Sequence, residues 1–242
     1  TNYYEFSFFS SGCDVVFFAT PNGVAMGMAG ELIEKNIKVI DISADYRIKD
    51  IELWEKWYGQ KHLSPELVNQ SVYGLPEMHG QREKIASSMI VGNPGCYPTA
   101  ALLALLPIMN HLPKQNIIID AKSGISGAGR NLDSNKLFAS GEDNFQAYAV
   151  KNHRHYPEIM SILQTVDPAN SDLLFVPHLS SMIRGIYSSA YVKTSLDRKN
   201  EITEMYEKYY ESSPFVEICN SENFPRVSDV SSTNKCMISL NY

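Results

Sequence analysis

The sequence predicts an α/β protein in which a doubly wound parallel sheet comes first and a mixed sheet follows. The first portion alternates short, continuous apolar runs with a helical segment, as strands buried on both faces require. Residues 185–194 instead alternate in polarity like an antiparallel strand with one solvated face. Because 44% of the 242 residues are hydrophobic, the chain can bury a substantial core.

In the first portion we expect strands at residues 14–19, 38–42 and 85–91, with a helix at 24–36. The polar and aromatic residues 44–80 are expected to wrap the edge of the sheet. Thr20-Pro21-Asn22-Gly23 forms the turn after the first strand. Ligands of open α/β sheets bind at the carboxyl ends of strands, so this turn is well placed for a ligand.

In the second portion, residues 97–112 are apolar on nearly all sides, which predicts a buried helix. Pro107 should either kink this helix or lie where the lost hydrogen bond is tolerated. Helices are also expected from near Pro157 and at 201–212. Further strands are expected at 116–121, 173–176 and 185–194, and near Phe215 and Met237. A change in pattern near residue 92 predicts two domains, 1–91 and 92–242.

Composition excludes several classes of protein. The net charge is −6, from 21 basic and 27 acidic residues, which argues against general nucleic-acid binding. No apolar run approaches the ~20 residues of a membrane helix, and residues 1–11 show no secretory signal. The four cysteines have no CxxC spacing, which favours a reducing, cytoplasmic compartment.

One cysteine follows a tight turn at the end of an expected strand, in GNPGCYPT (92–99). Backbone amides at a helix start carry partial positive charge, stabilise a thiolate and lower the pKa of a cysteine. They can also hold the oxyanion that forms when a thiolate attacks a carbonyl. Pro98 suits a first helical turn. Cys96 is therefore a candidate nucleophile, and the alternative is a small cysteine packed at a turn.

Two histidines stand in HRHYPEI (153–159). Histidine is the usual acid–base partner of a nucleophilic thiol. Pro157 predicts a helix start, which places His155 in the preceding loop. His153 and His155 could share a strand face and bind a metal, but no nearby Cys or Asp completes such a site, so no metal is expected. A surface pair beside a helix cap is the other alternative.

The segment KSGISGAGR (122–130) is rich in glycine, which lets backbone approach a ligand closely. Its spacing matches neither the phosphate loop nor the dinucleotide fingerprint, and by itself it is as typical of a flexible loop. Arg184, at the start of an expected strand, can grip a carboxylate or phosphate with two parallel hydrogen bonds. A surface salt bridge is the alternative for Arg184.

Together these segments resemble the N-acetyl-gamma-glutamyl-phosphate reductases of arginine biosynthesis. The matching stretches are FFATPNG (17–23), DISADYR (41–47), YGLPE (73–77), GNPGCYPTA (92–100), KSGISGAGR (122–130), HRHYPEI (153–159), VPHLSSMIRGI (176–186) and TNKC (233–236). The resemblance covers nearly the whole chain. The related aspartate-semialdehyde dehydrogenases share the plan and a cysteine nucleophile but are less similar in the histidine motif, and glyceraldehyde-phosphate dehydrogenase is more distant.

The resemblance implies an NADP-dependent oxidoreductase that reduces N-acetyl-glutamyl 5-phosphate to N-acetyl-glutamate 5-semialdehyde and phosphate through a cysteine thioester. It implies an incomplete Rossmann-like domain (1–91), followed by an α+β catalytic and dimerisation domain (92–242). The implied partners are a small acyl phosphate and further copies of the chain, as a dimer or tetramer, without nucleic acid or membrane. The catalytic residues would be Cys96 and His155, with His153 as the second candidate for the acid–base group. Substrate contacts would come from Arg184, His153 and Asn93, and NADP contacts from Thr20, Pro21, Gly23, Ser43, Ser126 and Gly127.

The family begins with a strand, a GxxGxxG turn and a helix that bind the NADP pyrophosphate, and it ends with a helix that returns to the cofactor domain. Neither is recognisable here, so we expect a chain truncated at both ends, with weakened NADP binding. Three alternatives remain open: a non-catalytic assembly fragment, an aspartate-semialdehyde dehydrogenase-type reductase, and a thiol hydrolase that uses Cys96 and His155.

Overall fold

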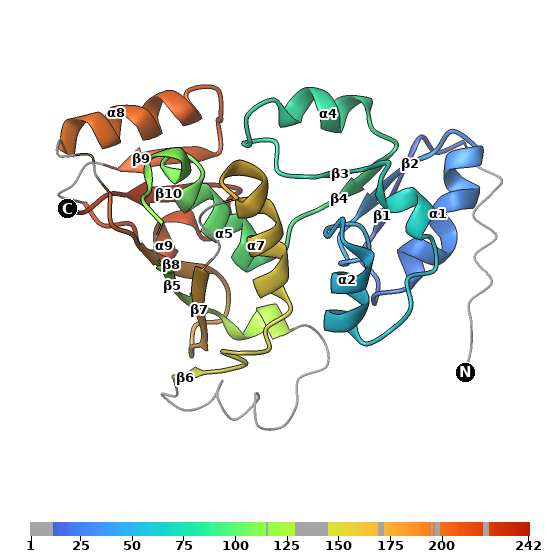
Figure 1. Ribbon diagram of the computed structural model, residues 1–242, viewed down its shortest axis with the longest axis horizontal. Helices are drawn as coiled ribbons and strands as arrows, with labels where there is room; N and C mark the ends of the chain where they lie inside the picture. The colour runs from blue at the N-terminus through green and yellow to red at the C-terminus, as the bar shows by residue number, and fades with distance from the viewer. Residues whose placement is uncertain are drawn as a thin grey trace. The chain divides into compact units, whose positions relative to one another are not determined.

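The computed structural model describes residues 12–114, 116–128, 145–168, 172–194, 196, 199–219 and 223–242 (Figure 1). The chain divides into two compact units, Thr1–Pro94 and Gly95–Tyr242, called here the first and second units. The expectations for residues 1–11 and for Gly129 and Arg130 lie outside the described residues. No helix in the described part of the chain is long and apolar enough to cross a membrane.

The first unit is built on a four-stranded sheet in the order β1-β2-β4-β3, and every neighbouring pair is parallel. This confirms the parallel sheet predicted for the first portion. The strands are β1 (Val15–Phe18), β2 (Lys38–Asp41), β3 (Ser71–Tyr73) and β4 (Ile90–Gly92). The connecting helices are α1 (Val24–Glu34), α2 (Ile51–Tyr58), α3 (Pro65–Val68) and α4 (Gln81–Ser87).

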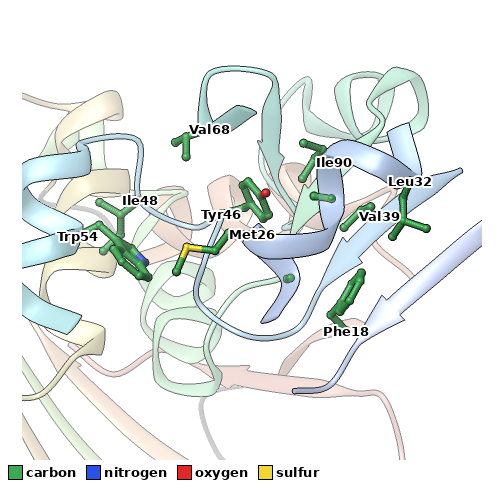
Figure 2. Close-up of a cluster of buried hydrophobic side chains, with 11 residues drawn as sticks. Phe18, Met26, Leu32, Val39, Tyr46, Ile48, Trp54, Val68 and Ile90 are labelled. Atoms are coloured by element: carbon green, nitrogen blue, oxygen red, sulfur yellow. The ribbon is translucent and has the colours of Figure 1, made fainter. Parts of the chain in front are cut away.

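The core of the first unit is a cluster of buried side chains from α1, α2, the strands and the loop after β2 (Figure 2). Trp54 of α2 is completely buried, and its indole N–H donates to the carbonyl of Ala44 at 2.7 Å. Tyr46 is also buried, with its hydroxyl 2.7 Å from Ser64 Oγ. Each polar tip thus has a partner, which lets these large rings anchor the loop after β2 in the core.

A second set of contacts ties the loop after β2 to the start of α1. Gly23 precedes α1 with a φ of 100°, a conformation that favours glycine. Its N–H donates to both carboxylate oxygens of the fully buried Asp45 at 3.0 Å, and the Met26 N–H donates to the same group at 3.1 Å. Asp45 therefore satisfies amides that an α-helix leaves open at its N-terminus.

The expectation for residues 85–91 was wrong in its first half, because α4 continues to Ser87 and β4 begins only at Ile90. The Lys38 ammonium donates to the carbonyl of Ala86 at 2.9 Å and so stabilises the negative end of α4. Residues 44–80 do more than wrap the sheet edge, since they supply β3, which pairs with β4.

The second unit contains the predicted mixed sheet, in the order β6-β7-β5-β8. Strand β5 runs parallel to β7 and antiparallel to β8, and β6 is antiparallel to β7. A separate parallel pair joins β9 to β10. The strands are β5 (Asn116–Ser123), β6 (Gln146–Ala147), β7 (Asp172–Leu179), β8 (Ile186–Tyr191), β9 (Val216–Cys219) and β10 (Cys236–Ser239).

Three longer helices accompany this sheet: α5 (Cys96–Leu105), α7 (His155–Val166) and α8 (Lys199–Tyr210). Helices α5 and α7 lie side by side (Figure 1). The expected helix at 97–112 is shorter and does not kink. It ends at Leu105, two residues before Pro107, because proline cannot donate the next helical bond. A short 3₁₀ turn, η1 (Met109–His111), follows, and a short helix, α9 (Val227–Val230), precedes β10.

The two faces of the mixed sheet differ in burial. Ile117, Ile119 and Ala121 of β5 are buried, whereas the intervening Ile118 is exposed. In register with Ile118 stand Leu174 of β7 and Tyr191 of β8, which are 48% and 57% exposed. This open face of the sheet, formed by Ile118, Leu174, Tyr187 and Tyr191, therefore presents apolar surface to solvent.

We predict that Asp45→Ala lowers the free energy of unfolding by about 2 kcal/mol, because the buried Met26 amide and the half-buried Gly23 amide lose their acceptor. Asp50→Ala is the matched control. Asp50 caps α2 through a single, exposed bond from the Leu53 N–H, so its loss should cost about 1 kcal/mol or less. Urea denaturation of both variants provides the measurement, and an equal or smaller loss for Asp45→Ala would contradict this role.

Candidate active site

The candidate nucleophile, Cys96, is the first residue of α5, and its side chain is exposed. The other three cysteines are half-buried. Helix α5 has no acidic residue in its first turn, and its N-cap, Gly95, has no side chain to cap it. The positive end of the helix therefore remains available to a thiolate or an oxyanion at Cys96.

His155 lies against the residue that precedes Cys96. A Cβ atom placed on Gly95 would lie 2.5 Å from His155 Nε2 and 2.8 Å from Cδ2. The imidazole can occupy this position only because Gly95 has no side chain. The structure corrects the expected loop position of His155, which is the first residue of α7. The correction is small in space, since Arg154, the N-cap, is the last residue outside the helix.

His153 takes part in a chain of hydrogen bonds with two tyrosines. The His155 N–H donates to His153 Nδ1 at 3.1 Å, which makes Nδ1 an acceptor and places the proton of the neutral ring on Nε2. Nε2 lies 3.3 Å from the Tyr148 hydroxyl, and that hydroxyl donates to the Tyr97 hydroxyl at 3.3 Å. The Tyr97 hydroxyl in turn donates to the carbonyl of His178 at 3.1 Å.

Burial and the nearby Arg154 guanidinium lower the pKa of His153 from an ordinary value of 6.5 to about 4. Burial also raises the pKa of both Tyr97 and Tyr148, so the hydroxyls stay protonated. His153 is therefore a neutral ring at neutral pH, and its two nitrogens have different, fixed partners.

The sequence did not single out Glu158, Tyr97 or Tyr148. Glu158 is completely buried on α7, and its Oε1 accepts from the Gly95 N–H at 2.8 Å. A charged residue one turn after His155 in an otherwise apolar helical stretch was the available signal. The tyrosines gave no such signal, because their pairing joins residues 51 positions apart in the sequence.

The cofactor candidates of the first unit gather at the carboxyl ends of β1 and β2. Asn22 Oδ1 accepts from the Ala44 N–H at 3.2 Å and joins the two turns. The Gly23 N–H is engaged by Asp45, and the Ser43 hydroxyl donates to Asp41. Thr20 Oγ1 is buried and, within the described part of the chain, has no hydrogen-bond partner. This hydroxyl is therefore open to a further partner, whereas the Gly23 N–H and the Ser43 hydroxyl already have partners in neighbouring loops.

In the second unit, Ser126 and Gly127 lie exposed in the short 3₁₀ turn η2 (Ile125–Ala128). This turn is joined to the segment around Arg184, since the Ser126 N–H donates to the carbonyl of Ile183 at 3.0 Å. Gly124 has no room for a side chain, because a Cβ atom there would lie 2.8 Å from the backbone nitrogen of Arg184. The structure thus brings Ser126, Gly127 and the exposed Arg184 together.

Asn93 belongs to the first unit, where its N–H donates to the carbonyl of Asp41 at 2.8 Å. Its carbonyl accepts from Arg47 Nε at 2.6 Å, and its side-chain amide donates to the carbonyl of Pro94 at 3.2 Å. Asn93 is thus a tethered residue of the loop after β4. Among the described residues, no group of three or more His, Cys, Asp or Glu could hold a metal ion.

Comparison with known proteins identifies relatives of both units. The family model "Semialdehyde dehydrogenase, dimerisation domain" matches residues 96–242, and "Semialdehyde dehydrogenase, NAD binding domain" matches residues 2–88. N-acetyl-gamma-glutamyl-phosphate reductases from Aromatoleum aromaticum and Nitrosomonas europaea are 46% and 47% identical over 230 and 232 residues. These alignments cover 94% and 95% of this chain and 66% and 67% of the relatives. The chain thus spans about two thirds of the length of these curated relatives.

Solved structures of the same fold include aspartate semialdehyde dehydrogenase II from Vibrio cholerae. It has a TM-score of 0.63 and 15% identity, covering 93% of this chain and 68% of that one. The aspartate semialdehyde dehydrogenase from Candida albicans, solved with NADP, has a TM-score of 0.61 and 10% identity, covering 89% and 64%. At this level of identity the likeness concerns the fold.

We predict that His153 makes the folded state less stable in acid. Its folded pKa is lowered to about 4 from 6.5, so the neutral ring contributes stability above pH 6.5 that is lost as the pH falls toward 4. The full contribution is about 3 kcal/mol. In His153→Asn the amide oxygen can still accept from the His155 N–H, but the side chain does not titrate. The free energy of unfolding of this variant should therefore fall less between pH 6.5 and pH 4 than that of the parent chain.

Urea denaturation at several pH values measures this difference. His79→Asn, at an exposed position, is the control and should follow the parent chain. Parallel stability curves for the parent and His153→Asn would contradict the assignment of a buried, neutral His153.

Proposed function

The chain belongs to the semialdehyde dehydrogenase family, and we propose that it forms the catalytic part of an NADP-dependent N-acetyl-glutamyl-phosphate reductase. The observation that carries this proposal is the placement of His155 directly against Gly95, next to an exposed Cys96 at a helix start. The 46–47% identity to reductases of that name supports the substrate, an N-acetyl-glutamyl phosphate.

In the proposed reaction, the Cys96 thiolate attacks the acyl carbon, the carbon–oxygen bond to phosphate breaks, and inorganic phosphate leaves. The product of this step is a thioester on Cys96. The amides at the start of α5 hold the oxyanion that forms at the acyl carbon. A bound nicotinamide nucleotide would supply a hydride for the thioester carbon. Covalent capture by Cys96 divides one difficult step into two easier ones.

His155 is the proposed acid–base group. It protonates the oxygen of the hemithioacetal and takes the proton back as the carbon–sulfur bond breaks, which releases N-acetyl-glutamate 5-semialdehyde and the thiolate. The hydrogen bonds of His153 argue against that residue. Its Nδ1 accepts from the His155 amide, and its low pKa disfavours the charged form that a general acid requires.

The first unit is the proposed NADP-binding part. This rests on the NAD-binding family model at residues 2–88, the NADP in a structure of the same fold, and the buried Thr20 hydroxyl, which has no partner among the described residues. Pro21, Ser126 and Gly127 are proposed as further cofactor contacts. For Arg184, a contact to the substrate carboxylate is proposed, with Asn93 as a second substrate contact. A cytoplasmic location would keep Cys96 reduced.

We predict that Cys96→Ser abolishes NADPH-dependent turnover and that His155→Asn lowers kcat by roughly 10²–10⁴-fold. His153→Asn should lower kcat less, because that residue supports the helix start without exchanging a proton. The assay is phosphate-dependent oxidation of the semialdehyde, in this chain and in a chain extended to the length of its relatives. A larger loss in His153→Asn would reverse the assignment of the two histidines.

The same assay decides between the alternatives. Activity confined to the extended chain would mean that the 242 residues alone act as an assembly piece. Nicotinamide-dependent turnover that disappears in Cys96→Ser would exclude a thiol hydrolase. Faster turnover of aspartyl phosphate than of the N-acetyl-glutamyl substrate would favour an aspartate-semialdehyde dehydrogenase-type reductase.

A homo-oligomer is also proposed, with the open face of the mixed sheet as the contact between copies. The matching family model for residues 96–242 is named a dimerisation domain. The open face is apolar, and its charges are already paired: Asp120 accepts from Lys122 Nζ at 2.5 Å and lies 3.1 Å from His178 Nδ1. Such a surface can be buried against a second copy at a small electrostatic cost.

We predict that Leu174→Glu weakens self-association roughly 100-fold, because each copy would bury an unpaired carboxylate. Leu63→Glu is the control, since Leu63 is 64% exposed but lies in the first unit. Sedimentation velocity over a range of concentrations measures the association. An unchanged dissociation constant for Leu174→Glu would place the contact elsewhere.

A further inference from the structure

Glu158 is a completely buried carboxylate that accepts a hydrogen bond from a backbone amide at the start of another helix. It lies in the first turn of α7, one turn after His155. Its Oε1 accepts from the Gly95 N–H at 2.8 Å, across 63 positions of sequence. Gly95 is the N-cap of α5 and immediately precedes Cys96.

This arrangement explains how an acidic side chain is accommodated in the interior. A buried carboxylate is costly unless hydrogen bonds and nearby positive charge compensate for lost water. Here the group lies in the first turn of one helix and at the N-cap of another, and both helix starts carry partial positive charge.

Gly95 is held by α7 at two points. Its amide is bound by Glu158, and its Cα faces the imidazole of His155, which leaves no room for a side chain. Both contacts come from residues three positions apart on a single helix, so they form one rigid frame. That frame fixes the direction in which α5 begins, and therefore where Cys96 stands relative to His155.

We propose that Glu158 is a positioning residue, which acts through the Gly95 amide to hold Cys96 at its working distance from His155. The proposal rests on the proposed function, in which Cys96 is the nucleophile. Glu158 touches neither substrate nor cofactor in this role. What matters in this role is that the side chain is long enough to place an acceptor oxygen on the Gly95 N–H. The negative charge of Glu158 matters less.

Two conservative substitutions separate position from charge. In Glu158→Gln the amide oxygen can still accept from the Gly95 N–H, but the charge is gone. In Glu158→Asp the charge remains, but the carboxylate is withdrawn by one methylene and cannot reach the amide. The readout is the rate at which iodoacetamide alkylates Cys96 in the 242-residue chain, followed by mass spectrometry from pH 5 to 9, alone and combined with His155→Asn.

Glu158→Gln should keep the rate at neutral pH within about twofold of the parent, and Glu158→Asp should lower it about tenfold. In a His155→Asn background, Glu158→Asp should cause no further loss, because there is no longer an imidazole to be aligned with. Glu207→Gln, at an exposed position of α8, is the control and should leave the rate unchanged. Equal labelling of Cys13, Cys219 and Cys236 in every variant reports an intact fold.

Three outcomes would overturn the proposal: Glu158→Asp like the parent, Glu158→Gln as slow as Glu158→Asp, or additive losses from Glu158→Asp and His155→Asn. If a Glu158 variant does not fold, Gly95→Ala tests the same frame, because its methyl group would displace the His155 ring. That variant should slow alkylation only when His155 is present. Since alkylation needs no substrate, failure of the reductase assay would leave this test intact.

Discussion

The chemistry proposed for this chain depends on one close approach, that of helix α7 to the backbone at Gly95. A hydrogen atom at this position, in place of a side chain, lets an imidazole lie where a methyl group would come within 2.5 Å of it. Two further features of the second unit support that approach. Buried faces of α5 and α7 pack together, and hydrogen bonds at both ring nitrogens hold His153, next to His155, in one tautomer. The proposed nucleophile and its proposed acid–base partner are thereby held near each other by packing, at a helix start whose amides favour negative charge.

In the first unit, buried carboxylates hold the loops in place by accepting hydrogen bonds from loop amides. Asp41 and Asp45 are both inaccessible to solvent, and each binds amides of nearby turns. Burial raises the pKa of Asp41, against which the bonds from Ser43 act. Arg47 continues this network to the carbonyls of Ile42 and Asn93. The loops at the carboxyl edge of the sheet are therefore held by charge and hydrogen bonds, while the helices behind them are held by the apolar cluster of Figure 2.

Much of this could be read from the sequence, for physical reasons that also explain the misses. Continuous apolar runs predicted β1, β2 and the parallel sheet, because a strand covered on both faces needs such a run. Cys96 and His155 became candidates through local motifs. The end of α4 was missed because Ile85 and Ala86 are as apolar as a strand residue, and the helix is stabilised by the distant Lys38. Glu158, Tyr97 and Tyr148 gain their roles from contacts between residues far apart in sequence, which no local pattern encodes.

The carboxylate of Asp45 has a consequence for ligand selection at the edge of the first sheet. A helix that starts after a parallel strand ordinarily attracts anions. Here the Asp45 carboxylate already accepts from the Gly23 and Met26 amides at the start of α1. A phosphate arriving at this helix start would meet repulsion, whereas an uncharged ring or a sugar hydroxyl would meet none. If the proposed NADP-binding role is right, this edge would therefore favour an uncharged part of the nucleotide over its phosphates.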